Sequence, residues 1–156
     1  MFSATMEYAL RATVFLAAQG KPCVNHEIAA AMQVPVGYLA KVLQNLRRAG
    51  IVKSQRGLRG GFVLSRPARE ITILDVVNSV DPVPRIWQCP LGLKEHKHQL
   101  CPLHKQLDRA AEMIEKIFGE HTIDEMVVKA TKDDPLKALD VFAKAHHCDE
   151  TSEECG

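Results

Sequence analysis

Apolar residues recur at helical spacing in three separate stretches of the first fifty positions. The first stretch, residues 6–18, predicts an amphipathic helix that ends before Gly20. In the second stretch, Asn25 is the expected N-cap of a short helix that stops by Pro35. The third stretch follows almost at once, so the pattern predicts two helices joined by a tight turn.

The third predicted helix runs from about Val36 to Gly50 and has two different faces. Its apolar face consists of Leu39, Val42, Leu43 and Leu46. Its outer face consists of small, polar and cationic residues, namely Gly37, Ala40, Lys41, Gln44, Arg47 and Arg48. Two helices joined by a short turn, the second with a cationic outer face, are typical of a helix-turn-helix whose second helix enters the major groove of DNA.

Two short strands are predicted next, at residues 51–56 and 61–65, joined by the glycine-rich turn RGLRGG. A hairpin in this place is a wing, and arginines near its tip can meet the sugar-phosphate backbone or enter the minor groove. The turn has no Gly-Lys-Ser/Thr ending and leads into no helix, which excludes a nucleotide-binding loop. We expect Tyr38 to be partly buried with its hydroxyl near a phosphate. The predicted DNA contacts are Gly37, Tyr38, Lys41, Gln44, Arg47, Arg56, Arg59 and Gly60.

The rest of the chain predicts further helices. Residues 71–80 form a short one, and a longer one carries an apolar stripe of Leu103, Leu107, Ala110, Ala111, Ile114, Ile117 and Phe118. A small DNA-binding head offers little for this stripe to pack on, so a second subunit is its simplest partner, with intramolecular packing as the alternative. A weaker amphipathic stretch covers 123–130, and the polar end of the chain is expected to be disordered.

These elements predict a mainly α fold with a small β-hairpin wing: a winged helix-turn-helix followed by a long dimerisation helix. Four segments are expected: the DNA-binding domain at 1–82, a cysteine- and histidine-containing loop at 83–105, the dimerisation helix and its buttress at 106–132, and a C-terminal segment at 133–156. A length of 156 residues suits this organisation. No apolar run is long enough to span a bilayer, and Glu7 and Arg11 interrupt the start where a signal peptide is apolar. A cytoplasmic protein without a membrane partner is therefore expected.

Charge is divided unevenly along the chain, although the whole carries only +1. Residues 1–70 contain ten Lys and Arg against three Asp and Glu, a net charge of +7, which leaves −6 for the remainder. This asymmetry is typical of a nucleic-acid-binding module joined to a part with another role. No set of nucleophile, base and acid is recognisable, so an enzyme is not expected.

Two of the five cysteines lie in an unusual context. Cys89 and Cys101 are twelve positions apart in a proline-bracketed segment, and His104 follows three positions later. Thiolate and imidazole together suit an iron–sulfur cluster, zinc or copper, but the paired Cys-x-x-Cys of many zinc sites is absent. An odd number of cysteines without a secretion signal argues against a disulfide framework. The remaining cysteines, Cys23, Cys148 and Cys155, are expected to pack or to lie in a solvated tail, and His96, His98, His146 and His147 are secondary metal-ligand candidates.

Several runs together resemble the bacterial Rrf2 family of winged-helix transcriptional regulators, which includes the iron–sulfur regulator IscR and the nitric oxide sensor NsrR. These runs are EYALRA, YLAKVLQNLRRAGIV and RGLRGGFVLSRPAREITILDVVNSVD, followed by the cysteine loop, and they cover roughly residues 1–120. The resemblance implies a homodimer that binds double-stranded DNA at a palindromic operator. It also implies a cluster near the dimer interface.

Family members typically hold the cluster with three cysteines and a fourth ligand that is a histidine after the last cysteine or an acid in the first helix. By this resemblance Cys89 matches the first cysteine, Cys101 the last, His104 the histidine and Glu7 the acid. The middle cysteine is absent, its place falling near Glu95 and His96. A 2Fe–2S cluster with mixed ligands is therefore favoured over 4Fe–4S, because imidazole in place of thiolate raises the reduction potential of such a cluster.

The sequence thus predicts a DNA-binding regulator, with a repressor favoured, whose operator affinity depends on the redox or ligation state of a bound cluster. Two alternatives stay open. One is a cluster-free member of the family that senses through its thiols or through zinc. The other, from a different class, is a redox or metal-handling protein in which the basic half is incidental.

Overall fold

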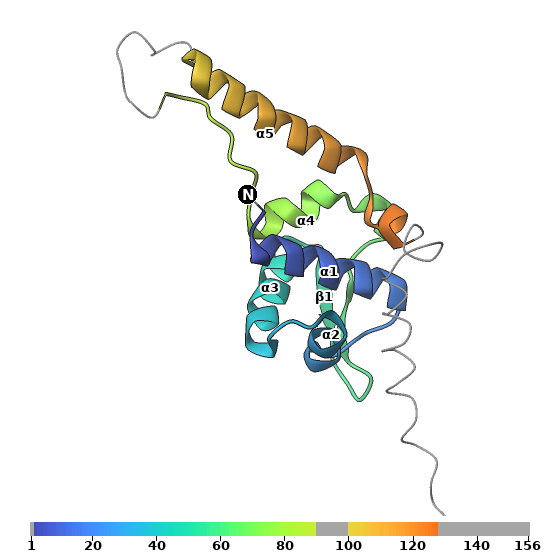
Figure 1. The fold of residues 1–156 in the computed structure, drawn as a ribbon. Coiled ribbons are helices and arrows are strands. Elements are labelled where there is room, and N and C mark those ends of the chain that lie inside the picture. Colours follow the sequence, from blue (N-terminus) through green and yellow to red (C-terminus); the bar gives the residue numbers. More distant parts are fainter. Residues whose placement is uncertain (1, 90–99, 128–156) are drawn as a thin grey trace, which may run out of the picture.

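Five helices and one antiparallel hairpin build the part of the chain that the computed structural model describes, residues 2–89 and 100–127 (Figure 1). In chain order they are α1 (Ala4–Gln19), α2 (Asn25–Met32), α3 (Val36–Arg48), β1 (Val52–Gln55), β2 (Gly61–Leu64), α4 (Ile73–Val80) and α5 (Pro102–Glu120), with a short 3-10 turn at Ala68–Glu70 before α4. This order confirms the predicted mainly helical fold with a two-stranded wing. The expected segment 133–156 lies outside the described residues.

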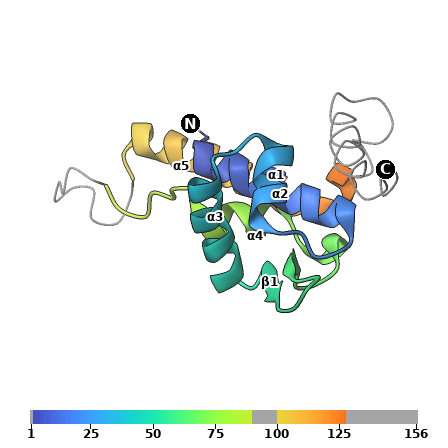
Figure 2. The same cartoon turned by 90° about the horizontal axis from the view of Figure 1, so that it is seen from below.

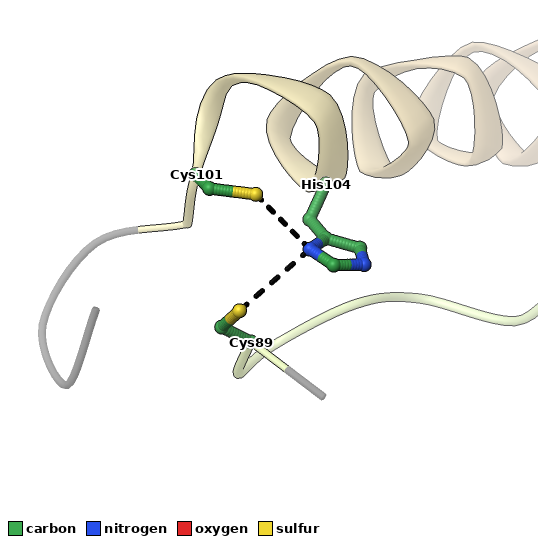
Figure 3. Close-up of side chains that lie close together, drawn as sticks. All are labelled: Cys89, Cys101 and His104. Atoms are coloured by element: carbon green, nitrogen blue, oxygen red, sulfur yellow. Dashed lines mark hydrogen bonds between the residues drawn. The ribbon is translucent and has the colours of Figure 1, made fainter. Parts of the chain in front are cut away.

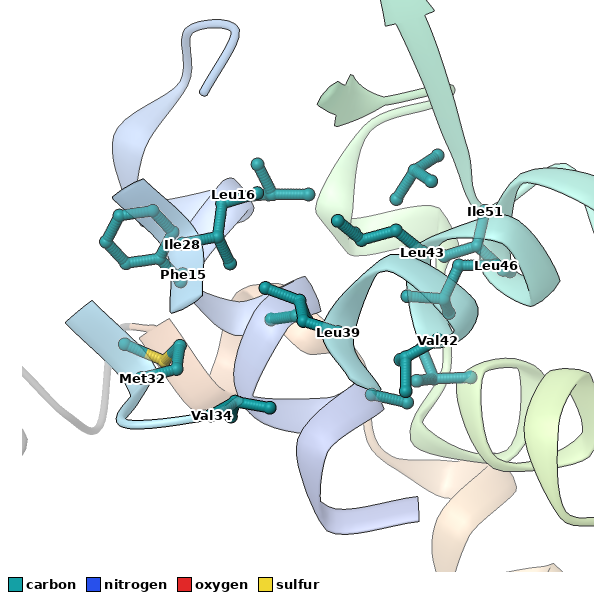
Figure 4. Packing of buried hydrophobic residues seen from close by; sticks show 14 of the residues in the cluster. Phe15, Leu16, Ile28, Met32, Val34, Leu39, Val42, Leu43, Leu46 and Ile51 are labelled. Carbon is teal, nitrogen blue, oxygen red and sulfur yellow. The ribbon is translucent and has the colours of Figure 1, made fainter. Parts of the chain in front are cut away.

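The head of the molecule is held together by one apolar core to which α1, α2, α3, α4 and both strands contribute. The predicted apolar face of α3 is fully inside it, and α1 and α2 supply facing side chains (Figure 4). Leu39, Leu43 and Leu46 are completely buried, as is Ile28 from α2. Truncating one such leucine to alanine costs about 2–5 kcal/mol. The core therefore fixes which side of α3 is left for solvent.

Helix ends follow ordinary capping chemistry with one departure from expectation. The Ser3 side chain accepts a hydrogen bond from the Met6 amide at the start of α1, and Thr72 and Asp75 form a reciprocal capping box on α4. The prediction of Asn25 as N-cap of α2 was wrong. Asn25 is the first helical residue, its side chain donates instead to the Val36 carbonyl, and the cap position falls to Val24.

The wing is fastened to the turn that follows α1. Strands β1 and β2 pair from Val52 opposite Leu64 to Gln55 opposite Gly61. Near the turn end of β2, Cys23 and Phe62 exchange two backbone hydrogen bonds of 3.0 and 2.8 Å. A Cβ on Gly61 would lie 2.5 Å from the Cys23 carbonyl oxygen, so this approach requires glycine. Backbone hydrogen bonds therefore connect the wing to the helical part of the head.

Helix α5 crosses above α4, on the side of the head away from the wing tip (Figure 1). Its Ala111, Ile114 and Phe118 pack in a second apolar cluster with Met6 of α1, Val77 of α4 and Val83 of the connecting segment. The intramolecular packing that was the alternative is therefore observed for these three residues, of which Ala111 is buried and Ile114 and Phe118 are half-buried. A second subunit as partner of the exposed part of the stripe stays a prediction. The large apolar side chains left exposed on α5 are Leu103, Leu107, Met113 and Ile117, and we call these four residues the α5 stripe.

The C-terminal end of α5 returns to the head. Thr72 and Thr122 form an antiparallel bridge, with Ile73 donating to the His121 carbonyl at 3.0 Å and Ile123 to the Ile71 carbonyl at 2.9 Å. A further helical stretch starts at Ile123, as the weaker amphipathic pattern predicted, and reaches the limit of the described residues at 127. Among the described helices, none combines the length and apolar character needed to cross a membrane.

Candidate nucleic-acid interface and metal site

Helix α3 and the wing tip project from the same side of the head (Figure 2). Lys41, Gln44 and Arg47 are exposed on α3, opposite its buried leucines, as predicted. Arg56 and Arg59 are exposed at the hairpin turn. Within residues 2–89 and 100–127, none of these four cations lies within ion-pair distance of a carboxylate. They form a cationic surface with no acidic partner of its own among the described residues.

Glycines at this surface have different roles. Gly37 lies in the first turn of α3 with open space around its Cα, which lets a ligand approach the backbone closely. Gly60 has a conformational role, since a Cβ there would meet the Gln55 and Gly57 carbonyl oxygens at 2.5 and 2.9 Å. The tight turn that presents Arg59 therefore depends on Gly60.

Tyr38 is engaged with α1. Its hydroxyl is hydrogen-bonded to the Thr5 hydroxyl, and its ring meets Tyr8 edge-on with centroids 5.5 Å apart. The side chain is 39% exposed, in line with the partial burial expected. The Tyr38 side chain therefore connects the start of α3 to the N-terminal part of α1.

Three potential metal ligands converge at the N-terminal end of α5. The ligand atoms of Cys89, Cys101 and His104 all lie within 4.8 Å of one another (Figure 3). His104 Nδ1 lies 3.1 Å from Cys101 Sγ and 3.7 Å from Cys89 Sγ. Cys101 is the N-cap residue of α5 and His104 stands in its first turn, so a spacing of three places both side chains on one side of the helix. Cys89 is buried and the other two are half-buried.

Two thiol sulfurs and an imidazole nitrogen form a donor set for soft or borderline metals such as iron in a cluster or zinc. An oxygen-seeking cation would find no suitable ligand among the three. The geometry therefore fits a metal or iron–sulfur centre bound by these side chains. Helix α5 begins at Pro102, so His104 lies within the helix and not in the loop that was expected to extend to residue 105.

Glu7, the remaining predicted ligand, is not part of this group. Its carboxylate lies on α1, is 56% exposed and is paired with Arg11 one turn along the helix. Within one chain the structure brings together Cys89, Cys101 and His104, and Glu7 stands apart.

The other candidate ligands contribute nothing to this group. Cys23 is buried beside β2, where burial raises the pKa of its thiol, in line with the predicted packing role. Cys148, Cys155, His96, His98, His146 and His147 lie outside the described residues.

Sequence reasoning missed the residues that attach the segment before Cys89 to α5. The segment from Val83 to Cys89 has no regular secondary structure, and it is attached to α5 through Arg85, which contacts Asp108 and Glu115. The signal available in the sequence was weak: two acids seven positions apart lie on one face of a helix, but nothing indicates which cation they meet.

Comparisons with known proteins agree with these observations. Residues 2–129 match the Rrf2 family, described as an iron-dependent transcriptional regulator. An HTH-type transcriptional regulator of Mycobacterium tuberculosis is 42% identical over 93 residues, and the match spans 58% of each protein. One from Aquifex aeolicus is 31% identical over 131 residues, covering 81% of this chain and 91% of that protein.

Solved structures share the fold at lower identity. CymR, the global cysteine regulator of B. subtilis, superimposes with a TM-score of 0.69 at 23% identity, over 83% of this chain and 97% of the other. IscR of T. potens gives a TM-score of 0.69 at 22% identity, over 88% and 95%. These likenesses confirm the winged helix-turn-helix architecture. Together with the match over residues 2–129, they establish that the chain belongs to the Rrf2 family, a family of transcriptional regulators and not of enzymes.

Proposed function

We propose that the protein is a cytoplasmic homodimeric repressor that binds a palindromic operator in double-stranded DNA. Its operator affinity depends on the redox or ligation state of a 2Fe–2S cluster held by Cys89, Cys101 and His104. The convergence of these three side chains in a chain with an exposed cationic α3 and wing is the observation that carries the proposal. Family membership makes a non-regulatory redox or metal-handling protein the weaker interpretation.

DNA binding is assigned to the surface formed by α3 and the wing. Lys41, Gln44 and Arg47 face the major groove and its walls, with Gly37 and Tyr38 at the start of the same helix. Arg56 and Arg59 reach the flanking backbone or the minor groove, and Gly60 holds the turn between them. Cations that lack acidic neighbours keep their full attraction for phosphate, because no internal ion pair has to be broken first.

Dimerisation is assigned to the α5 stripe. Four large apolar side chains on one helix face are too many for an isolated surface helix, and a second copy of the same helix covers them symmetrically. A twofold dimer places two α3 helices against two half-sites, which is why we expect the operator to be palindromic.

Metal binding is assigned to Cys89, Cys101 and His104, and the donor set agrees with the family's description as iron-dependent. A bound cluster supplies one-electron redox chemistry, at a potential that imidazole ligation raises. Three side chains leave one ligand position unassigned. Glu7 remains our candidate for it, and because Glu7 stands outside the group within one chain, it would reach the cluster from the second subunit.

The competing function within the same family is a cluster-free sensor that uses its thiols or bound zinc. The 3.1 Å contact of Cys101 Sγ with His104 Nδ1 favours it, since it places an imidazole beside a thiol, a pairing that recurs in thiol chemistry. Iron and acid-labile sulfide in anaerobically purified protein separate the two: about two of each per chain support the cluster. Their absence, with zinc or reactive thiols in their place, supports the alternative.

The test of the regulatory proposal is operator binding by cluster-loaded and cluster-free protein at several salt concentrations. We expect a steep loss of affinity with salt, as phosphate contacts require, and a different affinity for the two forms. Cys89→Ala should abolish both the visible absorption and this difference. Cys23→Ala is the matched control, because it removes a buried cysteine away from the site and should keep both. Equal operator affinity of loaded and cluster-free wild type refutes cluster sensing.

A further inference from the structure

The segment that delivers Cys89 runs antiparallel along one face of α5. Val83 packs in the cluster that contains Ala111, Arg85 and Ile86 contact Asp108, and Cys89 meets His104 near the start of the helix. His104, Asp108 and Ala111 follow one another at spacings of four and three, so they share a face. Residues nearer the C-terminal end of this segment therefore contact residues nearer the N-terminal end of α5.

Arg85 makes the densest set of polar contacts on this face. Its Nε donates to Asp108 Oδ1 at 2.8 Å and its Nη2 to Oδ2 at 3.0 Å, a bidentate pair, while Nη1 donates to Glu115 Oε2 at 2.7 Å. The backbone amide of Ile86 donates to Asp108 Oδ1 at 2.9 Å. The Arg85 and Asp108 side chains are each only 18% exposed. We call Arg85, Ile86, Asp108 and Glu115 the α5 clamp.

Other features strengthen the clamp. The ring of Trp87 lies with its centroid 5.0 Å from the Arg85 guanidinium carbon, which favours the charged arginine further. Hydrogen bonds from Arg85 hold the pKa of the Asp108 carboxyl at about 2, so the carboxylate is charged at neutral pH. Ion pairs elsewhere on α5 differ from this one: Lys116 and Glu120 are 3.9 Å apart and well exposed.

Arg85 and Ile86 of the α5 clamp lie close to Cys89 in sequence, so the clamp limits how far Cys89 can lie from α5. Only two residues separate Cys89 from Ile86, so the Cα atom of Cys89 stays within about 10 Å of the Cα atom of Ile86, whose amide is bonded to Asp108. His104 lies one helical turn before Asp108 on α5, and Cys101 lies at the helix start. Among the described residues, no regular element contains Cys89. Its position relative to the two α5 ligands therefore depends on the contacts that Arg85 and Ile86 make.

We propose that Arg85, acting through Asp108 and Glu115, is the positioning residue that holds Cys89 against Cys101 and His104 and so preorganises the three-ligand site. The proposal rests on the metal-binding part of the function proposed above. Arg85 binds no metal itself. It determines how much of the time the Cys89 sulfur lies within reach of the other two ligands.

The test uses the full-length cluster-free chain and two measurements of ligand proximity. The first is the affinity for Co²⁺, followed by its thiolate-to-metal charge-transfer absorption. The second is the equilibrium with glutathione disulfide, in which the Cys89 and Cys101 thiols form one disulfide and release two glutathione thiols. We expect Arg85→Gln to weaken Co²⁺ binding about tenfold, the lower end of what removing a supporting contact costs a metal site. The equilibrium constant for the protein disulfide should fall by a similar factor.

Two further variants and a control make the result specific. Asp108→Asn should match Arg85→Gln in both measurements, and Arg85→Lys should fall between wild type and Arg85→Gln, because lysine keeps the charge but has no fork for bidentate contact. Lys116→Gln is the control, since it removes the exposed pair on the same helix. It should leave Co²⁺ affinity and the disulfide equilibrium unchanged. Circular dichroism identifies any variant that fails to fold, and Arg85→Lys then carries the comparison.

Opposite outcomes are clearly separated. A folded Arg85→Gln with wild-type Co²⁺ affinity and wild-type disulfide equilibrium overturns the positioning role. If wild type binds no cluster in the cell but Arg85→Gln still lowers both measured values, the positioning role stands and the cluster-sensing function fails. If all of these variants bind Co²⁺ as wild type does, and Cys89→Ala alone does not, the ligand assignment stands and the positioning role fails.

Discussion

Placing a charge in the α5 stripe tests dimerisation directly, and Leu107→Glu is the most informative choice. Leu107 is 51% exposed and lies near the centre of the stripe, whereas Ile114 packs against the chain's own core and would report on folding instead. The four stripe residues fall within about 120° of the helix circumference, so one partner helix can cover them all. Twofold symmetry places every substitution in the interface twice.

The size of the effect follows from the exposed area. Complete burial of a leucine side chain contributes about 1.5–3 kcal/mol, so covering the exposed half contributes about 1 kcal/mol for each stripe residue in each subunit. Leu107→Glu loses this twice, about 2 kcal/mol, and the two carboxylates lose further free energy by desolvation without a partner. We expect a total of at least about 4 kcal/mol, which raises the dimer dissociation constant about a thousandfold.

Sedimentation equilibrium at micromolar concentration measures this constant. Wild type should sediment as a dimer and Leu107→Glu as a folded monomer, with Leu107→Ala between them. Lys105→Glu introduces the same side chain on the opposite, polar face of α5 and should stay dimeric. A Leu107→Glu protein that sediments as the wild-type dimer across the whole concentration range would refute the assignment of this face.

Three shorter predictions concern the wing and the clamp. Arg59→Ala should weaken operator binding without lowering the melting temperature, and the salt dependence measured by fluorescence anisotropy should decrease by about one unit of slope. Gly61→Ala places a Cβ against the Cys23 carbonyl oxygen, so chemical denaturation should show a loss of about 1–3 kcal/mol. Asp108 has its pKa lowered to about 2 by Arg85, so its stabilising contribution is complete above about pH 4 and is lost as the pH falls toward 2. Thermal unfolding from pH 6 to pH 2 should therefore show wild type more stable than Asp108→Asn at the upper end, with the difference vanishing at the lower end.

The spacing of apolar residues predicted the helices correctly where the residues on the apolar face are also the ones that the fold buries. The apolar face of α3 is buried as expected because Leu39, Leu43 and Leu46 recur at spacings of four and three, which places them on one side of the helix. The N-cap of α2 was missed for a local reason. Glu27 accepts a hydrogen bond from the Val24 amide, so the helix starts one residue earlier than expected and the Asn25 side chain is left to donate to the Val36 carbonyl of α3.

Periodicity also reveals that a helix face is apolar without revealing what covers it. On α5 one apolar face meets two environments. Phe118 packs on the head, whereas Leu107, eleven positions earlier and therefore on nearly the same side of the helix, stays exposed. Tertiary packing makes this division, which the spacing of one helix does not encode.

Part of the candidate metal site could be predicted from spacing in the sequence, and part could not. Cys101 and His104 lie together because three residues make about one helical turn, which is readable from spacing alone. Their meeting with Cys89 depends on Arg85 and Asp108, which are 23 positions apart and form no recognisable motif. Such a long-range ion pair is visible only once the chain is folded.

Helix α5 links the candidate metal site to the head through one continuous element. Its 19 residues make a helix about 28 Å long. Its C-terminal part is fixed to the head by Ala111, Ile114 and Phe118 and by the backbone hydrogen bonds of His121 and Ile123, while the thiols and imidazole lie at its N-terminal end. A tilt of about 5° about Ala111 would move that end, about 14 Å away, by about 1 Å. The same N-terminal part carries Leu103 and Leu107 of the α5 stripe, so we expect a change in the position of Cys89 to alter the interface that sets the distance between two DNA-binding heads.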